Sequence, residues 1–330
     1  MEKIGAIMKE ALFYTKLEDH KVRCDLCPHN CVISPGNIGI CRARKNIDGI
    51  LYAINYGETI TISIDPMEKK PLYHFHPGES ILSIGPNSCN FSCKFCQNYQ
   101  SSQFVVPTTT ITPDKLLEQC KTHNCNFVAF TYTEPITWFE FIIDSSKILK
   151  KNGIKTVMVT NGFINQEPLK ELLPYIDAMN IDLKAYDKKF YKTICNGSLQ
   201  PVLETIKTAS QSCHIEVTNL IITDENDSEK QIKDLVDFVA NVNPNIPLHF
   251  SRYYPTYKMD NPPTSVSKLE MAKEIAEKKL NYVYLGNIIT ERNTICPNCD
   301  HLLICRDYPL KNDIVDGKCP SCDNTIYGEF

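Results

Sequence analysis

Long apolar runs are missing from this 330-residue sequence. No stretch approaches the ~20 apolar residues that span a bilayer, and the start, Met1-Glu2-Lys3-Ile4, lacks the apolar core of a secretory signal. Repeats and low-complexity tracts are missing too. These absences argue against membrane-spanning, secreted and fibrous proteins, and we expect a cytoplasmic chain with no membrane partner.

A large excess of one charge is also absent. Lys and Arg total 35 against 39 Asp and Glu, which gives a net charge of -4. The composition therefore offers no overall electrostatic reason to expect a nucleic-acid partner. With 42% hydrophobic and 22% charged residues, the chain has enough apolar side chains for one large core or two modest ones.

Cysteine, in contrast, is abundant, with 16 residues in a chain that shows no sign of export. A reducing cytoplasm keeps thiols free, and clustered thiols there more often hold metal than form disulfides. Three tight groups stand out, which are Cys24, Cys27, Cys31 and Cys41; Cys89, Cys93 and Cys96; and Cys296, Cys299, Cys319 and Cys322. The scattered remainder are interpreted as core or surface thiols, namely Cys120, Cys125, Cys195, Cys213 and Cys305.

Short β-rich runs alternate with amphipathic helical stretches from about residue 80 to residue 288, which favours parallel strands joined by crossover helices. Thr112 is expected to cap one helix, and residues 267–280 carry the apolar stripe of another. Six or so such units predict an open α/β barrel, with a doubly wound sheet as the alternative. The predicted strands are 81–84, 127–130, 156–159, 178–181, 215–222, 248–250 and 282–285.

Polar clusters follow five of these strands directly. They occupy residues 131–135, 160–162, 182–184, 218–219 and 251–253. In parallel barrels and open sheets, ligands bind at the carboxyl ends of the strands, so we expect these clusters to meet at one rim and form a site. The alternative is that strand ends simply reach solvent.

The spacing C-x3-C-x2-C, formed by Cys89, Cys93 and Cys96, comes just after the first predicted strand of this region. Three thiolates with no fourth cysteine nearby can hold three irons of a [4Fe-4S] cluster and leave the fourth iron open, as a catalytic metal requires. A zinc site completed by a distant histidine is the competing interpretation.

The sequence resembles the radical S-adenosylmethionine (SAM) superfamily. The resemblance is carried by this motif, by residues 97–99, 131–135 and 181–184, and by the N-terminal cysteines that precede them. Within this superfamily, the sequence is similar to the AmmeMemoRadiSam-system enzymes, which are relatives of the pyruvate formate-lyase activating enzymes. The resemblance covers nearly the whole chain. It implies a partial (β/α)6 barrel whose open iron is chelated by S-adenosylmethionine. One electron from the cluster would then cleave a carbon-sulfur bond and give a 5'-deoxyadenosyl radical that abstracts hydrogen from a substrate.

The resemblance also implies roles for polar residues at the rim. Glu134 would accept hydrogen bonds from the amino group of the methionine moiety. Tyr132 and Thr133 stand where the activating enzymes have glycines, which puts in doubt any role that needs glycine backbone geometry. Phe95 would pack near the adenine, with an ordinary core role as the alternative.

Three further rim residues complete the predicted cofactor site. Asn161 follows the third predicted strand, and Asp182 and Lys184 follow the fourth. Asp182 and Lys184 are two residues apart, so an extended strand places them on one face, where they could hold the ribose hydroxyls and the methionine carboxylate. A surface salt bridge is the alternative. His249 and Arg252 are weaker candidates.

The N-terminal group reads C-x2-C-x3-C-x9-C. Four thiolates close a coordination sphere, so this metal should be structural or an electron relay. The crowding of the first three cysteines favours a second iron-sulfur cluster, while the C-x2-C start suits zinc equally well, and both stay open.

The C-terminal group consists of two matching C-P-x-C knuckles, which predict a zinc-ribbon or rubredoxin-like module that binds zinc. Metal binding would supply much of the folding free energy of so short a module. We expect it either to cap the barrel or to recognise a partner.

Three regions are therefore predicted: an N-terminal four-cysteine segment at 1–79, a radical SAM partial barrel at 80–289, and the zinc-ribbon-like module at 290–330. The predicted function is reductive cleavage of S-adenosylmethionine with hydrogen abstraction from a small molecule, peptide or RNA. The alternatives are activation of a glycyl-radical enzyme and a non-catalytic metal module that binds protein or nucleic acid. Expected partners are a one-electron donor such as ferredoxin or flavodoxin and, from the family name, a Memo-type protein.

Overall fold

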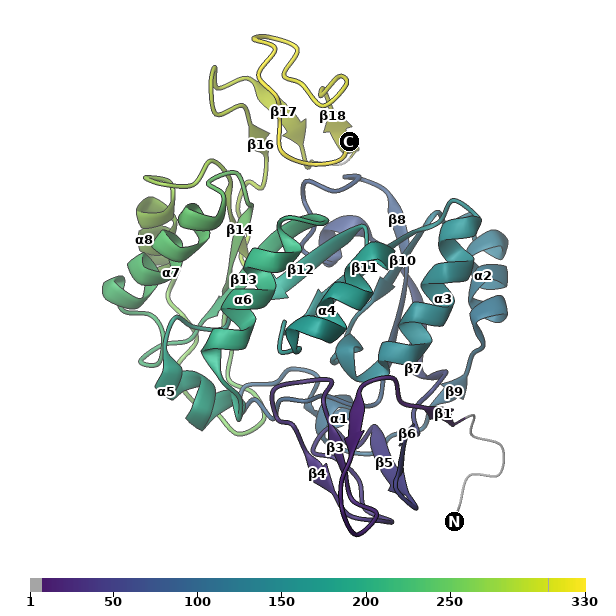
Figure 1. Cartoon of the computed structure of the whole chain (residues 1–330). Helices are drawn as coiled ribbons and strands as arrows, with labels where there is room; N and C mark the ends of the chain where they lie inside the picture. The colour runs from purple at the N-terminus through teal and green to yellow at the C-terminus, as the bar shows by residue number, and fades with distance from the viewer. Residues whose placement is uncertain (1–7, 308) are drawn as a thin grey trace.

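One large sheet organises the mixed α/β fold of the computed structural model, which describes residues 8–307 and 309–330 (Figure 1). Seven of its strands are parallel and follow one another in chain order. The order of these described strands never reverses, as it would in a doubly wound sheet, so that alternative does not fit. The parallel strands are β8 (Ser80–Pro86), β10 (Phe127–Phe130), β11 (Lys155–Thr160), β12 (Ala178–Asp182), β13 (His214–Ile221), β14 (Leu248–Arg252) and β15 (Val283–Gly286).

Helices connect the parallel strands and pack beside the sheet (Figure 1). The α-helices are α1 (Tyr99–Gln103), α2 (Pro113–Thr122), α3 (Phe139–Lys151), α4 (Gln166–Leu172), α5 (Lys188–Phe190), α6 (Leu199–Ala209), α7 (Glu229–Val242) and α8 (Val266–Ala276). Short helical turns are η1 (Met67–Lys69), η2 (Pro135–Trp138), η3 (Leu173–Tyr175) and η4 (Tyr191–Cys195), the last of which is a π-helix.

The sequence patterns locate these elements well. Strand β10 has the predicted bounds, and Thr112 caps α2 through a 3.2 Å hydrogen bond from the Lys115 amide to its hydroxyl. The apolar stripe of α8 is buried at Leu269 and Ala272, which places that face against the sheet. The predicted alternation of parallel strands and helices is therefore confirmed.

Two strands extend the sheet beyond its parallel part. Strand β7 (Glu58–Pro66) runs antiparallel to β8, and β9 (Thr109–Thr110) pairs with β7 at the edge. Gly85 in β8 permits close approach to the next strand's end, because a Cβ atom there would lie 2.1 Å from the Thr131 carbonyl oxygen. The sheet therefore draws one strand from the N-terminal 79 residues.

Small antiparallel sheets lie at opposite ends of the large one (Figure 1). The N-terminal strands lie near α1 and the carboxyl ends of the parallel strands, as the hydrogen bond from Asn165, after β11, to the Asp25 carbonyl shows. They are β1 (Lys9–Glu10), β2 (Tyr14–Lys16), β3 (Val22–Cys24), β4 (Val32–Ile33), β5 (Arg44–Ile47) and β6 (Ile50–Ala53).

The C-terminal strands lie at the amino ends of the parallel strands, and they are β16 (Thr294–Ile295), β17 (Leu302–Cys305) and β18 (Lys311–Asn312). Their core joins Ile304 and Ile326 to Tyr282, just before β15, and Cys296 and Cys319 are fully buried in it. The Tyr327 hydroxyl also bonds to the backbone of Ile215 in β13. The module therefore covers one end of the sheet.

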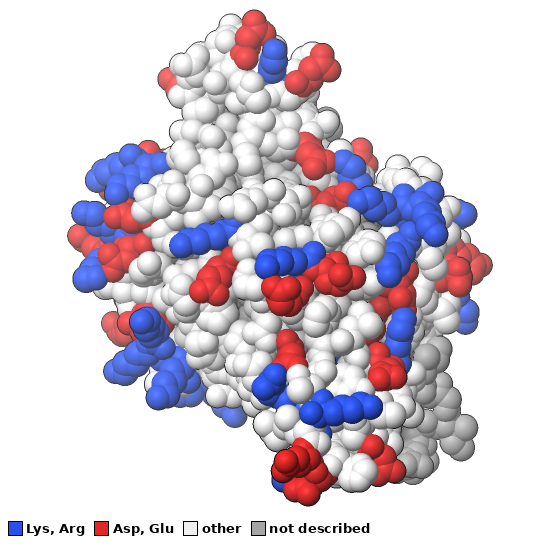
Figure 2. Space-filling model, viewed as in Figure 1, with Lys and Arg blue, Asp and Glu red and all other residues white. Residues whose placement is uncertain are grey.

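Lys and Arg are interspersed with Asp and Glu on the face drawn in Figure 2, mainly along its sides and lower part, and no large area carries one sign. In the described part of the chain, no helix is both long and apolar enough to cross a membrane.

Candidate functional site

A cavity of ≈ 380 Å³ opens at the carboxyl ends of the parallel strands. That volume is within the range of small-molecule sites. Every residue that the sequence predicts for the three-cysteine site lines this cavity: Cys89, Cys93, Cys96, Phe95, Glu134, Asn161, Asp182 and Lys184. The strand ends therefore converge on one site and do not simply reach solvent.

The loop that carries the three cysteines, residues 89–96, is called the motif loop here, and its backbone is fixed by a distant segment. The amides of Ser92 and Lys94 donate to the carbonyls of Cys195 and Ile194 at 3.0 Å each. The Cys195 thiol also donates a hydrogen bond to Cys93, which lowers the pKa of Cys93. The π-helix η4 therefore positions the centre of the motif loop.

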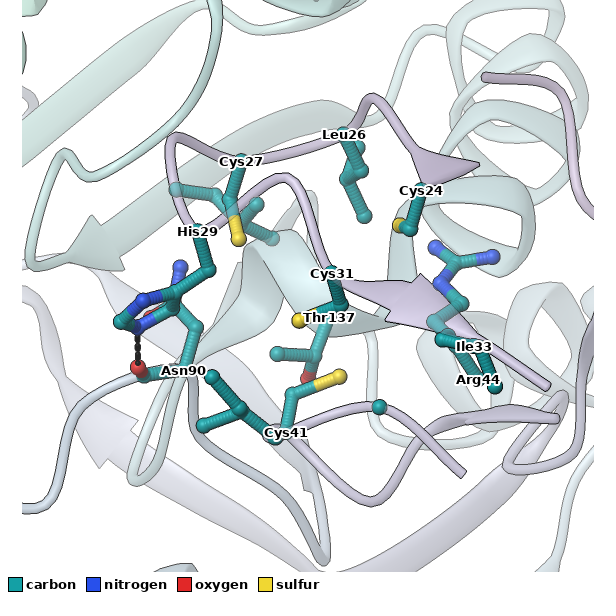
Figure 3. A pocket seen from close by; sticks show the side chains of 13 residues that line it. Cys24, Leu26, Cys27, His29, Cys31, Ile33, Cys41, Arg44, Asn90 and Thr137 are labelled. Carbon is teal, nitrogen blue, oxygen red and sulfur yellow. Dashed lines mark hydrogen bonds between the residues drawn. The ribbon is translucent and has the colours of Figure 1, made fainter. Parts of the chain in front are cut away.

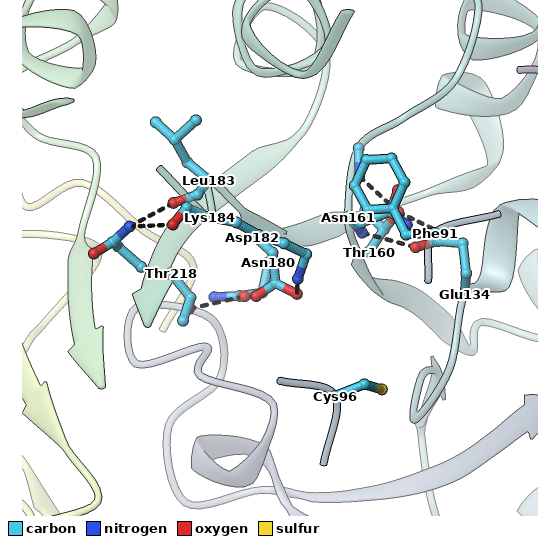
Figure 4. Close-up of polar contacts among 12 residues, drawn as sticks. Phe91, Cys96, Glu134, Thr160, Asn161, Asn180, Asp182, Leu183, Lys184 and Thr218 are labelled. Atoms are coloured by element: carbon cyan, nitrogen blue, oxygen red, sulfur yellow. Dashed lines mark hydrogen bonds and ion pairs between the residues drawn. The ribbon is translucent and has the colours of Figure 1, made fainter. Parts of the chain in front are cut away.

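Glu134 is 1% exposed and has hydrogen bonds to both carboxylate oxygens (Figure 4). Its Oε1 accepts from the Thr160 hydroxyl at 2.7 Å and the Ile136 amide at 3.0 Å, and its Oε2 accepts from the Asn161 amide at 2.8 Å. Burial nevertheless raises the pKa of Glu134 to about 7. Glu134 is thus a fixed buried carboxyl that a nearby cation would hold in its charged form.

Asn161 connects the end of β11 to the motif loop. Its Nδ2 donates to Asn90 Oδ1 at 2.8 Å and lies 4.0 Å from Cys89 Sγ, while its Oδ1 accepts from the Phe163 amide. Gly162 follows with φ +67°, a turn conformation that favours glycine. This side chain is therefore engaged in holding the loop next to a cysteine of the motif.

Asp182 and Lys184 share a face at the end of β12, as their spacing predicts. Lys184 Nζ donates to Asp182 Oδ2 at 2.9 Å, and the lysine side chain is only 14% exposed (Figure 4). Burial acts to lower the pKa of Lys184, but the Asp182 carboxylate and the Cys93 thiolate outweigh it and raise the pKa. The pair is thus part of the cavity wall and not a surface salt bridge.

Aromatic rings line the same wall. Phe95 is buried, with its ring 6.0 Å from Phe190 and 5.7 Å from Lys184 Nζ. Phe91 also lines the cavity and packs against Phe163. The cavity therefore offers an apolar surface beside its charged groups.

Tyr132, which replaces a glycine of the activating enzymes, adopts φ +71°. For a bulky residue this left-handed conformation costs about 1–3 kcal/mol. Its hydroxyl donates to Asp65 at 2.9 Å, and Lys70 Nζ lies 4.8 Å from its ring centre. The glycine-like backbone geometry is therefore kept in spite of the tyrosine, because contacts to residues before β8 fix the ring.

The two weaker candidates lie elsewhere. His249 is buried, 2.6 Å from Glu216, and Arg252 donates to the Thr264 carbonyl. Neither is among the residues that line the cavity. His249 is a core histidine hydrogen-bonded to Glu216, so the structure gives no support for a site role.

The four N-terminal cysteines, Cys24, Cys27, Cys31 and Cys41, line a separate small cavity, called the N-terminal cysteine pocket here (Figure 3). Asn90 of the motif loop and Thr137 of η2 also line it. Burial raises the pKa of the Cys24 thiol to about 11. The two cysteine sites are therefore neighbours, because Asn90 in the wall of this pocket directly follows Cys89, which lines the larger cavity.

The C-terminal quartet has a different geometry. Cys296 and Cys322 Sγ are 3.6 Å apart, and Cys299 and Cys319 Sγ are 3.7 Å apart. One ion with metal-sulfur bonds of about 2.3 Å in a tetrahedron sets sulfurs ~3.8 Å apart. Across the described residues, this is the one group of three or more Cys, His, Asp or Glu ligand atoms within 4.8 Å of one another. The quartet therefore fits a single tetrahedral ion.

The donors around the cavity fit a cluster with S-adenosylmethionine better than zinc. The three motif thiols are not close enough together for one ion, and none of the described residues lining the cavity is a histidine. S-adenosylmethionine carries an ammonium, a carboxylate, ribose hydroxyls and an adenine. Glu134, Lys184, Asp182 and Phe95 offer the matching acidic, basic, polar and aromatic groups.

Several cavity residues escaped sequence reasoning. Lys69 and Asn287 line the cavity, and Cys195 supports Cys93 from behind. The Lys69-Lys70 pair was visible as a charged break before the first strand of the barrel region, but a link between Cys195 and the motif has no signal in local spacing.

Comparisons with known proteins agree with this geometry. Residues 83–239 match the family described as the Radical SAM superfamily. An uncharacterized protein from Methanocaldococcus jannaschii is 46% identical over 332 residues, covering 97% of this chain and 99% of the relative. The pyruvate formate-lyase-activating enzyme of Clostridium pasteurianum is 24% identical over 161 residues, covering 47% of this chain and 67% of that enzyme.

A solved structure supports the fold. A radical SAM methyltransferase from Sphaerobacter thermophilus superimposes with a TM-score of 0.53 at 10% identity, covering 84% of this chain and 76% of that chain. At this identity the likeness concerns the fold alone.

Proposed function

The chain belongs to the radical SAM superfamily, and on that premise we propose that it is an enzyme that binds a [4Fe-4S] cluster at Cys89, Cys93 and Cys96 and cleaves S-adenosylmethionine reductively. One observation carries the proposal: among the described residues that line the cavity, three thiols and no fourth accompany Glu134, Lys184, Asp182 and Phe95, while Cys195 lies behind Cys93 and does not line it. Such a set matches the functional groups of the sulfonium nucleotide and leaves one iron free for it.

The residues of the cavity would bind and orient the nucleotide. Glu134, held by the Thr160 hydroxyl and two backbone amides, would accept hydrogen bonds from the methionine ammonium. Lys184 would pair with the carboxylate, and Asp182 would hold the ribose. When bound, the cluster and S-adenosylmethionine would supply a 5'-deoxyadenosyl radical through one-electron cleavage of a carbon-sulfur bond.

Anaerobic reconstitution tests this function directly. The loaded protein, reduced with dithionite and given S-adenosylmethionine, should release 5'-deoxyadenosine, which liquid chromatography detects. Failure of a fully loaded and reduced protein to release it would overturn the proposal.

The finer assignments belong to the same proposal. The chain-order parallel sheet supports a partial (β/α)6 barrel over 80–289, flanked by a four-cysteine segment at 1–79 and a module at 290–330. Sulfur spacings of 3.6 and 3.7 Å support zinc in a ribbon that caps the barrel. We place the chain with the AmmeMemoRadiSam-system enzymes, with ferredoxin or flavodoxin as electron donor and a Memo-type protein as partner.

The substrate that loses hydrogen is a small molecule, peptide or RNA. Similarity to the pyruvate formate-lyase-activating enzyme favours a second candidate, in which the substrate is a glycine of a partner enzyme. A non-catalytic metal module is disfavoured, because it has no need of Glu134, Asp182 and Lys184 around one cavity.

Binding of S-adenosylmethionine should depend on the ionisation of Glu134. Because its pKa is about 7, affinity should rise as the pH increases through about 7, where the carboxylate forms. Glu134→Gln should flatten this profile and weaken binding roughly tenfold or more. Equilibrium dialysis between about pH 6 and pH 8 measures it.

Because glutamine does not titrate, any pH dependence of binding that remains in Glu134→Gln comes from the ligand. In the unliganded protein, the raised pKa makes Glu134 stabilising below pH 4.5, and that stability is lost as the pH rises through about 7. Exposed Glu167→Gln serves as control. Equal pH profiles for wild type and Glu134→Gln would contradict the assigned role.

Lys184→Met should weaken S-adenosylmethionine binding roughly tenfold, because it removes the ammonium of a buried ion pair from the cavity wall. Lys170→Met is the matched control, since Lys170 is exposed and pairs with Glu167 three residues away. Calorimetric titration of both variants measures the difference. Equal affinity in the two would exclude Lys184 as a ligand-binding residue.

A further inference from the structure

The N-terminal cysteine pocket lies directly behind the motif loop, and nothing in the proposed function uses it. We propose that this pocket holds a second iron-sulfur cluster that delivers electrons to the cluster of the motif loop, with Arg44 as its counter-charge. The inference rests on the proposed function, because it needs the motif-loop cluster as the electron acceptor.

The spacing of the thiols favours a cluster over a single ion. Within the described residues, the C-terminal quartet is the one group of three or more such ligand atoms within 4.8 Å of one another, so no three of the sulfurs of Cys24, Cys27, Cys31 and Cys41 lie that close together. A single ion needs thiolates ~3.8 Å apart, whereas a cluster binds its cysteines through different irons. The C-terminal quartet thus has the spacing of a single-ion site, and the N-terminal cysteines have the wider spacing that a cluster needs.

Arg44 favours an occupant that accepts hydrogen bonds. Its side chain is 2% exposed and lines the pocket beside Cys24 (Figure 3). Nη1 donates to Glu140 at 2.7 Å, but Nε and Nη2 have no hydrogen-bond partner. Burying unpaired guanidinium donors is costly, so an occupant of the pocket that supplies acceptors would be stabilised. Four thiolates and bridging sulfides would supply them.

Two short connections join the pocket to the motif loop. His29, between Cys27 and Cys31, lies 2.7 Å from the carbonyl oxygen of Asn90, the neighbour of Cys89. Arg42, next to Cys41, donates to the Ser102 carbonyl at 2.8 Å.

The second connection reaches another ligand of the motif, because the Ser102 hydroxyl lies 3.3 Å from Cys96 Sγ. Each link therefore begins within two residues of a cysteine of one site and ends beside a cysteine of the other. This arrangement suits transfer of a single electron between two clusters.

The pocket also lies near the protein surface. Ile40, which lines it, is 55% exposed, and Val32 and Ile38 nearby are 61% and 50% exposed. A low-potential one-electron donor of the ferredoxin or flavodoxin class could approach here. One electron would pass from this donor to the N-terminal cluster, which is reduced and then reoxidised as it passes the electron to the motif-loop cluster. No bond in the protein changes.

Metal analysis of anaerobic protein tests the identity of the occupant. In Cys27→Ala, iron and acid-labile sulfide should fall by roughly half while zinc stays unchanged, because only one of two clusters is lost. Cys120→Ala, a buried thiol outside all three groups, should keep wild-type iron. Loss of zinc with iron unchanged in Cys27→Ala would overturn the inference.

The electron route has its own readout. With dithionite, which reaches the motif-loop cluster directly, Cys27→Ala should form 5'-deoxyadenosine at the wild-type rate. With reduced flavodoxin or ferredoxin, its rate of 5'-deoxyadenosine formation should fall at least tenfold. Unchanged activity with the protein donor would refute the relay. Because dithionite turnover reports the motif-loop cluster alone, failure of the relay and failure of the proposed function can be told apart.

Arg44→Lys keeps the charge opposite Glu140 but removes the donors that lack partners. This variant tests the N-terminal cluster if Cys27→Ala does not fold. In an EPR-monitored redox titration, the midpoint potential of one cluster should move to more negative values, since hydrogen bonds to cluster sulfurs raise the potential. The motif-loop cluster should be unaffected. No shift in either cluster would contradict the assignment of Arg44.

Discussion

Replacing Cys93 by alanine should abolish cleavage of S-adenosylmethionine and leave a folded protein that still carries its C-terminal metal. Cys93 is buried at the centre of the motif loop, where the Cys195 thiol donates to it. Two remaining thiolates cannot hold a site-differentiated cluster, so about four irons per chain should be lost. Iron analysis and 5'-deoxyadenosine assays on the anaerobic protein measure both effects.

Two controls separate loss of the cluster from loss of the fold. Zinc content and the far-ultraviolet circular dichroism of Cys93→Ala should match wild type, because the C-terminal quartet lies at the opposite end of the sheet. Cys120→Ala should keep both iron and activity. A Cys93→Ala protein that still forms 5'-deoxyadenosine would show that the motif loop does not hold the reactive cluster.

Cys299→Ala should have the opposite profile, with a large loss of stability and little loss of chemistry in the protein that remains folded. The C-terminal quartet has single-ion spacing, and metal binding at such sites is worth roughly 10 kcal/mol or more. Without the ion, Cys296, Cys319 and the apolar side chains packed on Tyr282 lose the cover of the module. Thermal unfolding and zinc analysis measure the effect.

The matched control is Cys305→Ala, a thiol of the same module outside the quartet. It should keep its zinc and unfold near the wild-type temperature. Cleavage of S-adenosylmethionine, assayed well below the unfolding temperature, should be close to wild type in both variants. Equal loss of cleavage in folded Cys93→Ala and Cys299→Ala would contradict this division between a reactive and a structural metal.

The parallel part of the fold follows from sequence pattern because its segments are buried and regular. Strand β10 is apolar at every position and bounded by polar residues, so its limits are unambiguous. Strands β7 and β9 are harder to predict, because their antiparallel pairing depends on contacts between segments far apart in the chain. Edge strands with exposed side chains also carry a weak apolar signal.

The cavity could be predicted for a related reason. Asp182 and Lys184 end a parallel strand, and such ends meet at one rim, so position in the chain indicates position in space. Cys195 and Asn90 could not be assigned in this way, because their roles arise from loop packing. Only the folded chain shows that Cys195 contacts Cys93 and that Asn90, the neighbour of Cys89, lines the N-terminal cysteine pocket.

Tyr132 illustrates the limit of reasoning from a single substitution. Loss of a glycine suggested loss of its backbone geometry, yet the residue keeps φ +71°. The contacts of its hydroxyl and ring to Asp65 and Lys70 involve a segment that precedes β8. Strain at this position is therefore offset by partners that local sequence does not indicate.

Low-temperature EPR examines directly the iron that has no cysteine ligand. The spectrum of anaerobically reduced protein is recorded before and after S-adenosylmethionine is added. Binding of the nucleotide to that iron should change the signal of the motif-loop cluster in wild type and leave Cys93→Ala without this signal. Only mononuclear metal at Cys89, Cys93 and Cys96, with a spectrum that the nucleotide does not alter, would contradict the account.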